Sequence, residues 1–154
     1  MNIITQIATV LLGVLGGALL LLALAIAPYW QSLEPQAFSD WFSTNVHFIA
    51  GVMMPLGFST AGMTWLATGL AVWKKQAGRY WLIGASVCAL IMLIVFPLYF
   101  RETNALLASG TLPLNEVGAT ISQWLNVHWI RTTAAIVGCF CAMSSAFATT
   151  QASE

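Results

Sequence analysis

Long apolar stretches separated by short polar segments organise this chain. About 20 apolar residues cross the hydrocarbon core of a bilayer as a helix, and each long stretch reaches that length. The pattern therefore predicts four membrane-spanning helices, at about residues 3–30, 46–73, 80–100 and 114–148. Loops are predicted in the polar segments between them, at 31–45, 74–79 and 101–113. We expect one domain over residues 1–154 with an all-α fold, an integral membrane four-helix bundle.

The composition points to the same class of protein. Hydrophobic residues make up 59% of the chain and charged residues 6%, where soluble domains carry about 25% charged residues. The formal net charge is zero and no basic run is present to bind phosphates, so we expect no nucleic acid partner. Cys88, Cys139 and Cys141 lie inside apolar stretches, so we interpret them as packing residues. Two histidines without nearby cysteines supply no zinc site, and no metal is predicted.

The cations of the short loop between the second and third helices predict the orientation. Lys74, Lys75 and Arg79 gather there, and such loops face the cytoplasm. Both termini are then cytoplasmic, in a multi-pass protein that we expect in a bacterial inner membrane. The remaining polar and aromatic residues near helix ends converge on the outer side: Trp41, His47, Arg101, Glu102, Asn104, Trp124, His128 and Arg131.

A polar stripe opens the fourth helix. Trp124, His128 and Arg131 follow one another at helical spacings of four and three residues, so they share one face. An imidazole, with an unperturbed pKa of about 6.5, exchanges protons near neutral pH and serves as a base or a ligand. A guanidinium holds an anionic or enolate oxygen with a fork of hydrogen bonds. The alternatives are a histidine bonded to a loop carbonyl, and an arginine that snorkels to the headgroups or pairs with Glu102.

Further residues are candidates for the same site. Asn104 follows the third helix and offers both a donor and an acceptor. Trp124 shares the stripe with His128 and is a candidate wall of an aromatic pocket. His47 and Trp41 are candidate substrate-binding residues, although a lone histidine near a helix start and a belt tryptophan are ordinary interfacial features.

These motifs resemble a known family. Phe96-Pro97-Leu98-Tyr99-Phe100, then Thr103-Asn104-Ala105-Leu106-Leu107, then Trp124-x3-His128-x2-Arg131 is similar to the anthrone-oxygenase-like family of small four-helix membrane proteins. The resemblance covers most of the chain, and its specific positions are Asn104, Trp124, His128 and Arg131. It implies the oxidation of anthrones or other hydrophobic phenols with dioxygen and without a cofactor.

For that chemistry the resemblance and the residues together suggest a mechanism. His128 would remove a proton from an activated C–H or phenol, and Arg131 with Asn104 would stabilise the enolate. The partners are then the lipid bilayer, a small hydrophobic substrate and dioxygen.

Two other functions stay open at this point. His47 and His128 would be the axial ligands of a haem b, with Arg101 and Arg131 at its propionates. Otherwise the protein is a non-catalytic accessory subunit of a larger membrane complex, or a homo-oligomer.

Overall fold

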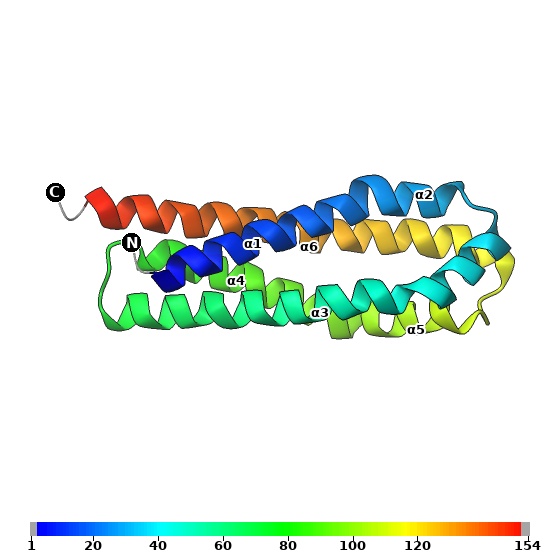
Figure 1. Cartoon of the computed structure of the whole chain (residues 1–154), viewed down its shortest axis with the longest axis horizontal. Coiled ribbons are helices and arrows are strands. Elements are labelled where there is room, and N and C mark those ends of the chain that lie inside the picture. The colour runs from blue at the N-terminus through cyan, green and yellow to red at the C-terminus, as the bar shows by residue number, and fades with distance from the viewer. Residues whose placement is uncertain (1–2, 152–154) are drawn as a thin grey trace.

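The computed structural model describes residues 3–151, and within them the chain forms four long antiparallel helical spans (Figure 1). All four are long and apolar enough to cross a membrane, so the chain is an all-α, multi-pass membrane four-helix bundle. The first span comprises α1 (Ile3–Leu21), the π turn η1 (Leu22–Ile26) and α2 (Ala27–Ser32). The second is α3 (Pro35–Trp73), and the fourth is α6 (Leu114–Gln151). The third comprises α4 (Arg79–Val95), the π turn η2 (Phe96–Phe100) and α5 (Arg101–Ser109).

Two of the predicted loops are wrong over most of their length. Helix α3 begins at Pro35 rather than near residue 46, because proline suits the first turn of a helix, where its missing N–H is not needed. Its first turns bury Phe38 and Phe42, which lie four residues apart on one face. The predicted loop at 101–113 is helical through Ser109, and Gly110 ends α5 with a φ of 67°.

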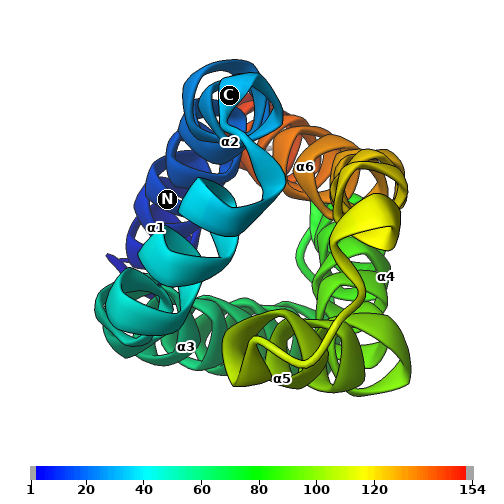
Figure 2. The same ribbon diagram turned by 90° about the vertical axis from the view of Figure 1, so that its right-hand side faces the viewer.

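The spans occupy the four corners of the bundle (Figure 2). Helix α1 packs against α3 and α6, and α4 likewise contacts α3 and α6. Farther along, α2 lies on α6, and α5 lies on α3. The start of α1, the end of α6 and the turn at 74–78 lie at one end of the bundle (Figure 1). We call this the terminal half (residues 3–21, 52–94 and 132–151) and the rest the distal half (residues 22–51 and 95–131).

The two halves have different cores. The terminal core consists mainly of alanine and leucine, with Ala8, Ala85 and Ala135 fully buried. The distal core is aromatic, and Trp124 contacts Trp30 and Phe100 edge to face, each at a ring-centroid distance of 5.3 Å. Small side chains let helix backbones approach closely in a membrane, whereas large rings keep them apart.

The spans are longer than a bilayer is thick. Helix α6 has 38 residues, so at about 1.5 Å per residue it is about 57 Å long, against about 30 Å of hydrocarbon. With the cationic turn at 74–79 on one membrane surface, about 20 residues of α4 and η2 bring the chain to Tyr99. A hydrocarbon core that begins at this turn would therefore end near the level of η2, with most of the distal half beyond it.

Candidate functional site

A cavity of about 680 Å³ lies between the spans, at the junction of the two halves. This volume falls within the range of small-molecule sites, about 300–1,000 Å³. Side chains from every span line it, and most of them are apolar. Residues that the sequence predicts for the site are among them: Asn104, Trp124, His128 and Arg131.

His128 lies fully buried in the wall of this cavity. Its Nε2 is 2.9 Å from the carbonyl oxygen of Leu19 on α1. Because a carbonyl oxygen only accepts hydrogen bonds, Nε2 carries the hydrogen, and Nδ1 of the neutral ring keeps its lone pair. That Nδ1 is buried and has no hydrogen-bond partner among the described residues. The sequence suggested a loop carbonyl as the partner of this histidine, but the carbonyl of Leu19 belongs to helix α1. Its bond to Nε2 fixes the ring and leaves Nδ1 as a hydrogen-bond acceptor without a partner in the described residues.

Arg131 follows one turn later and reaches the same cavity. Its guanidinium carbon lies 4.7 Å from the ring centroid of Phe100 and 6.0 Å from that of Phe96. Such cation–π contacts contribute about 0.5–2 kcal/mol. Its buried Nε has no hydrogen-bond partner within the described part of the chain. The alternative pairing with Glu102 is wrong. Glu102 is exposed, and the described structure has no ion pair between it and Arg131.

Asn104 holds the aromatic wall of the site. It lies on helix α5, where a loop was predicted, and its Oδ1 accepts a hydrogen bond of 2.9 Å from Trp124 Nε1. The Trp124 ring in turn stacks on His128, with a centroid distance of 4.7 Å and an interplanar angle of 10°. Asn104, Trp124, His128 and Leu19 therefore form one chain of contacts from α5 through α6 to α1. This chain restrains the imidazole at one face and at Nε2.

His47 and Trp41 lie outside the cavity lining. His47 is exposed, with its ring 3.9 Å from that of Phe48. Trp41 packs against Tyr29 and Trp30 at ring-centroid distances of 6.3 and 5.6 Å. Helix α3 turns Val46 and Ile49 toward the cavity, and a rotation of about 100° per residue takes position 47 away from it.

This placement bears on the haem hypothesis. A haem between His47 and His128 needs both rings at one cavity, but His47 is exposed and outside it, and His128 Nε2 is bonded to Leu19. The residues present do not fit that group. Among the described residues, no cluster of three or more His, Cys, Asp or Glu side chains has the arrangement of a metal site.

Sequence reasoning missed Phe96, which lines the cavity, and Phe100, which does not line it but contacts Arg131 and Trp124. Phe96 and Phe100 carry the Arg131 guanidinium, and they bracket η2. In η2 the N–H of Arg101 bonds to the carbonyl of Phe96, and in η1 the N–H of Ala27 bonds to that of Leu22, five residues back in each case. Single π turns are frequent at functional sites. The available signal was the proline in each region, Pro28 and Pro97, because neither has an N–H for an ordinary helical bond.

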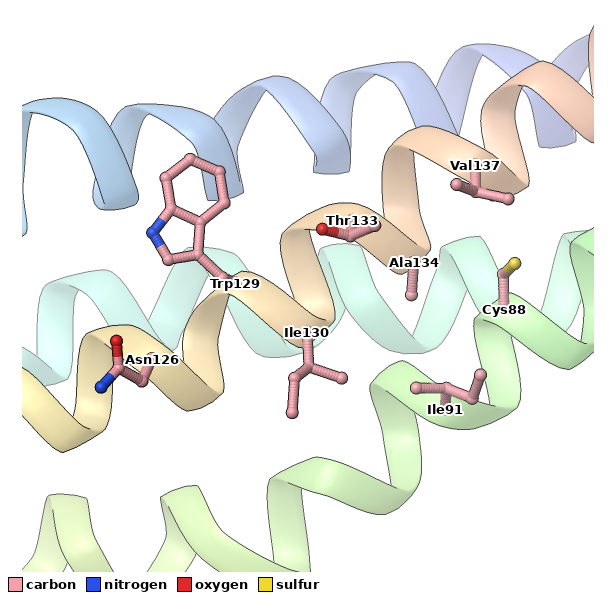
Figure 3. A pocket seen from close by; sticks show the side chains of 8 residues that line it. All are labelled: Cys88, Ile91, Asn126, Trp129, Ile130, Thr133, Ala134 and Val137. Atoms are coloured by element: carbon pink, nitrogen blue, oxygen red, sulfur yellow. The ribbon is translucent and has the colours of Figure 1, made fainter.

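A second hollow lies on the outside of the bundle, between α4 and α6 (Figure 3). It has a volume of about 510 Å³ and a mainly apolar lining. Ile130 and Ala134 point from α6 toward α4, where Cys88 and Ile91 complete the groove. Among its lining residues there is no acid, histidine or lysine, so its chemistry suits lipid contact rather than catalysis.

Fold and site together define the protein as a multi-pass membrane bundle with a buried histidine–arginine cavity. Comparisons with protein-family models, curated proteins and solved structures give no match. The resemblance to the anthrone-oxygenase-like family therefore stays a prediction.

Proposed function

We propose that this protein is a membrane oxidoreductase, a cofactor-independent oxygenase that acts on a flat, hydrophobic phenol or enol such as an anthrone. One observation carries the proposal. His128 Nδ1 is a buried acceptor and Arg131 Nε is a buried donor, and neither has a partner among the described residues. An unsatisfied buried polar group costs about 1–3 kcal/mol. Two such groups on one helix face are a cost that ligand binding would remove.

A single hydroxyl group satisfies both atoms. The two residues are three positions apart on α6, so their Cβ atoms lie about 5–6 Å from each other. A phenolic or enolic O–H between them donates to Nδ1 and accepts from Nε. When the proton passes to His128, the oxygen becomes an anion beside a guanidinium. Electrostatic stabilisation of this kind commonly contributes more to catalysis than any other single effect.

The reaction can be written with the protein's own groups. His128 removes the hydroxyl proton from the enol tautomer of the substrate, and Arg131 stabilises the resulting enolate. The enolate gives one electron to dioxygen, and the carbon radical and superoxide combine to form a C–O bond. His128 returns the proton to the peroxide. Loss of the remaining C–H proton, with cleavage of the O–O bond, releases water and leaves a carbonyl. Methylene and dioxygen thus become carbonyl and water, with no external reductant.

Access to His128 requires one side chain to move. None of the His128 surface is open to solvent, so a substrate atom reaches Nδ1 only when a neighbouring group gives way. Arg131 is the group best suited to move. Its guanidinium is held by contacts with aromatic rings, and its Nε forms no hydrogen bond in the described structure. An incoming oxygen atom attracts that guanidinium and draws it off the wall.

The test is dioxygen uptake and quinone formation with an anthrone, using purified protein and a metal chelator. We expect His128→Gln to lower the rate about 10²–10⁴-fold, the usual contribution of a positioned base. Glutamine still donates to the Leu19 carbonyl but has no basic nitrogen. His47→Ala is the matched control, because His47 is exposed and off the cavity, and its rate should equal that of the wild type. Equal rates for the wild type and His128→Gln would refute the mechanism.

We also propose that the cavity faces the outer side of a bacterial inner membrane, with both termini cytoplasmic. The cationic turn with Lys74, Lys75 and Arg79 supports this orientation. A periplasm-dependent reporter fused after Glu154 should be inactive, and the same reporter inserted at Gly110 should be active. The opposite pattern would reverse the orientation.

A further inference from the structure

The charged side chains that line the cavity are all cationic. Arg101 and Arg131 both line it, and none of its described lining residues is an aspartate or glutamate. We propose that it binds an amphiphile with an acidic head, a carboxylate or a phosphate, held between Arg101 and Arg131. This inference deepens the proposed function, because the ligand occupies the same cavity. It concerns binding, however, and its test needs no turnover.

The polar end of the cavity is built around the start of α5. Arg101, the exposed first residue of α5, lines the cavity, and so does Arg131, whose guanidinium lies over the ring of Phe100. Asn104 lies three residues after Arg101, on the same side of α5, and lines the cavity too. Its Oδ1 is taken by Trp124, which leaves its Nδ2 hydrogens as donors. Arginines and an amide N–H group form a donor set that suits an anionic oxygen.

The other end of the cavity is apolar. Met53, Met54 and Met92 line it together with Leu15 and Leu93, and these residues belong to the terminal half. Methionine side chains are flexible and adapt to chains of different shape. An acyl chain or an alkyl-substituted ring therefore fits here better than a rigid polar body.

The two ends lie in the order that a bilayer imposes on an amphiphile. The arginine end is at the level of η2, near which that hydrocarbon core would end, and the methionine end lies deeper in the core. Phe58 lines the cavity while 60% of its surface is exposed, so the cavity meets the outer face of α3 there. A ligand already in the outer leaflet would enter sideways without turning over.

Competition with a fluorescent fatty acid tests the inference, using the whole protein in phosphatidylcholine nanodiscs. The competitors are dodecanoate, dodecyl phosphate and dodecanol, which share one alkyl chain. For each protein the ratio of acid to alcohol affinity is measured, because this ratio cancels partition into lipid when variants are compared. We expect Arg101→Gln and Arg131→Gln each to lower the ratio about 10-fold, the value of a lost charged hydrogen bond. Lys74→Gln removes the same charge at the opposite end and should leave the ratio unchanged.

Several outcomes separate the hypotheses. An unchanged ratio in both arginine variants overturns the inference, and so does an equal fall in Lys74→Gln, which would indicate a general surface potential. Anthrone oxidation without acid selectivity would refute the inference and leave the proposed function in place. Acid selectivity without anthrone oxidation would support the inference and refute the proposed function. Phosphatidate added to the nanodiscs distinguishes the source: competition by it identifies a lipid headgroup, and its failure identifies a single-chain acid, each of which supports the inference.

Discussion

The terminal and distal halves of the bundle differ in the side chains that pack between their helices. In the terminal half, alanine and glycine bring helices into contact, as where Gly16 faces Ala135 across α1 and α6. Threonines there bond to their own helices, for example Thr64 to the carbonyl of Thr60 at 2.7 Å. In the distal half, large rings line one end of the cavity, and polar atoms remain without partners in the described structure. The comparison indicates that the terminal half supplies stability and the distal half gives up part of it for a site.

The largest effect in the distal half is expected from a substitution of Arg131 that keeps its positive charge. Arg131→Lys keeps a cation but loses the planar fork of donors. We expect the rate with an anthrone to fall about 10²–10³-fold, as on removal of one oxyanion donor. Thermal unfolding should be nearly unchanged, because the buried Nε has no described partner to lose and the ring contacts can be kept by an ammonium. A variant with wild-type turnover would remove Arg131 from the chemistry.

The same glycine-to-alanine change should have opposite signs at two positions, one at the end of the terminal half and one in the distal half. At Gly78, a Cβ would collide with the backbone oxygen of Ser145, so Gly78→Ala should lower the free energy of unfolding by about 1–3 kcal/mol. At Gly118, on the distal part of α6, a Cβ meets no atom within 4 Å. Gly118→Ala should therefore stabilise the helix by about 0.5–1 kcal/mol. Unfolding by denaturant or heat measures both, and equal signs would contradict the packing described at Gly78 and Gly118.

The smallest effect is expected at Trp129. This residue lies on α6 between His128 and Ile130, but it lines the outer groove and not the cavity. Trp129→Phe should change neither the oxidation rate nor the affinity for an acid more than about twofold, since it keeps an aromatic side chain toward lipid. A large loss of activity here would mean that the outer groove, rather than the cavity, holds the substrate.

The sequence predicted the spans and much of the site for one reason: both depend on regular spacing. Runs of about 20 apolar residues identify spans without reference to neighbours. Trp124, His128 and Arg131 share a face because a helix repeats about every 3.6 residues. The structure confirms the four-helix membrane bundle and brings these three residues to one cavity.

Features that depend on other parts of the chain were missed. Residues 35–45 look polar, yet Phe38 and Phe42 anchor them as helix against Trp30 of α2. The two π turns change the helical phase after Leu21 and Val95, and no spacing rule contains that change. His47 was grouped with His128 because both lie near the same end of the bundle. Only the rotation of α3 shows that its side chain is turned away.

The bond from His128 to Leu19 has a consequence for proton movement across the membrane. A backbone carbonyl accepts the Nε2 hydrogen but passes no proton onward, so no relay continues from this side of the ring. Any proton that Nδ1 gains must leave by the route it came, through the cavity. In the proposed reaction, the imidazole then takes up one proton and returns it to the same compartment in each cycle. Such a histidine moves no net charge through the protein, and turnover should be indifferent to the voltage across the membrane.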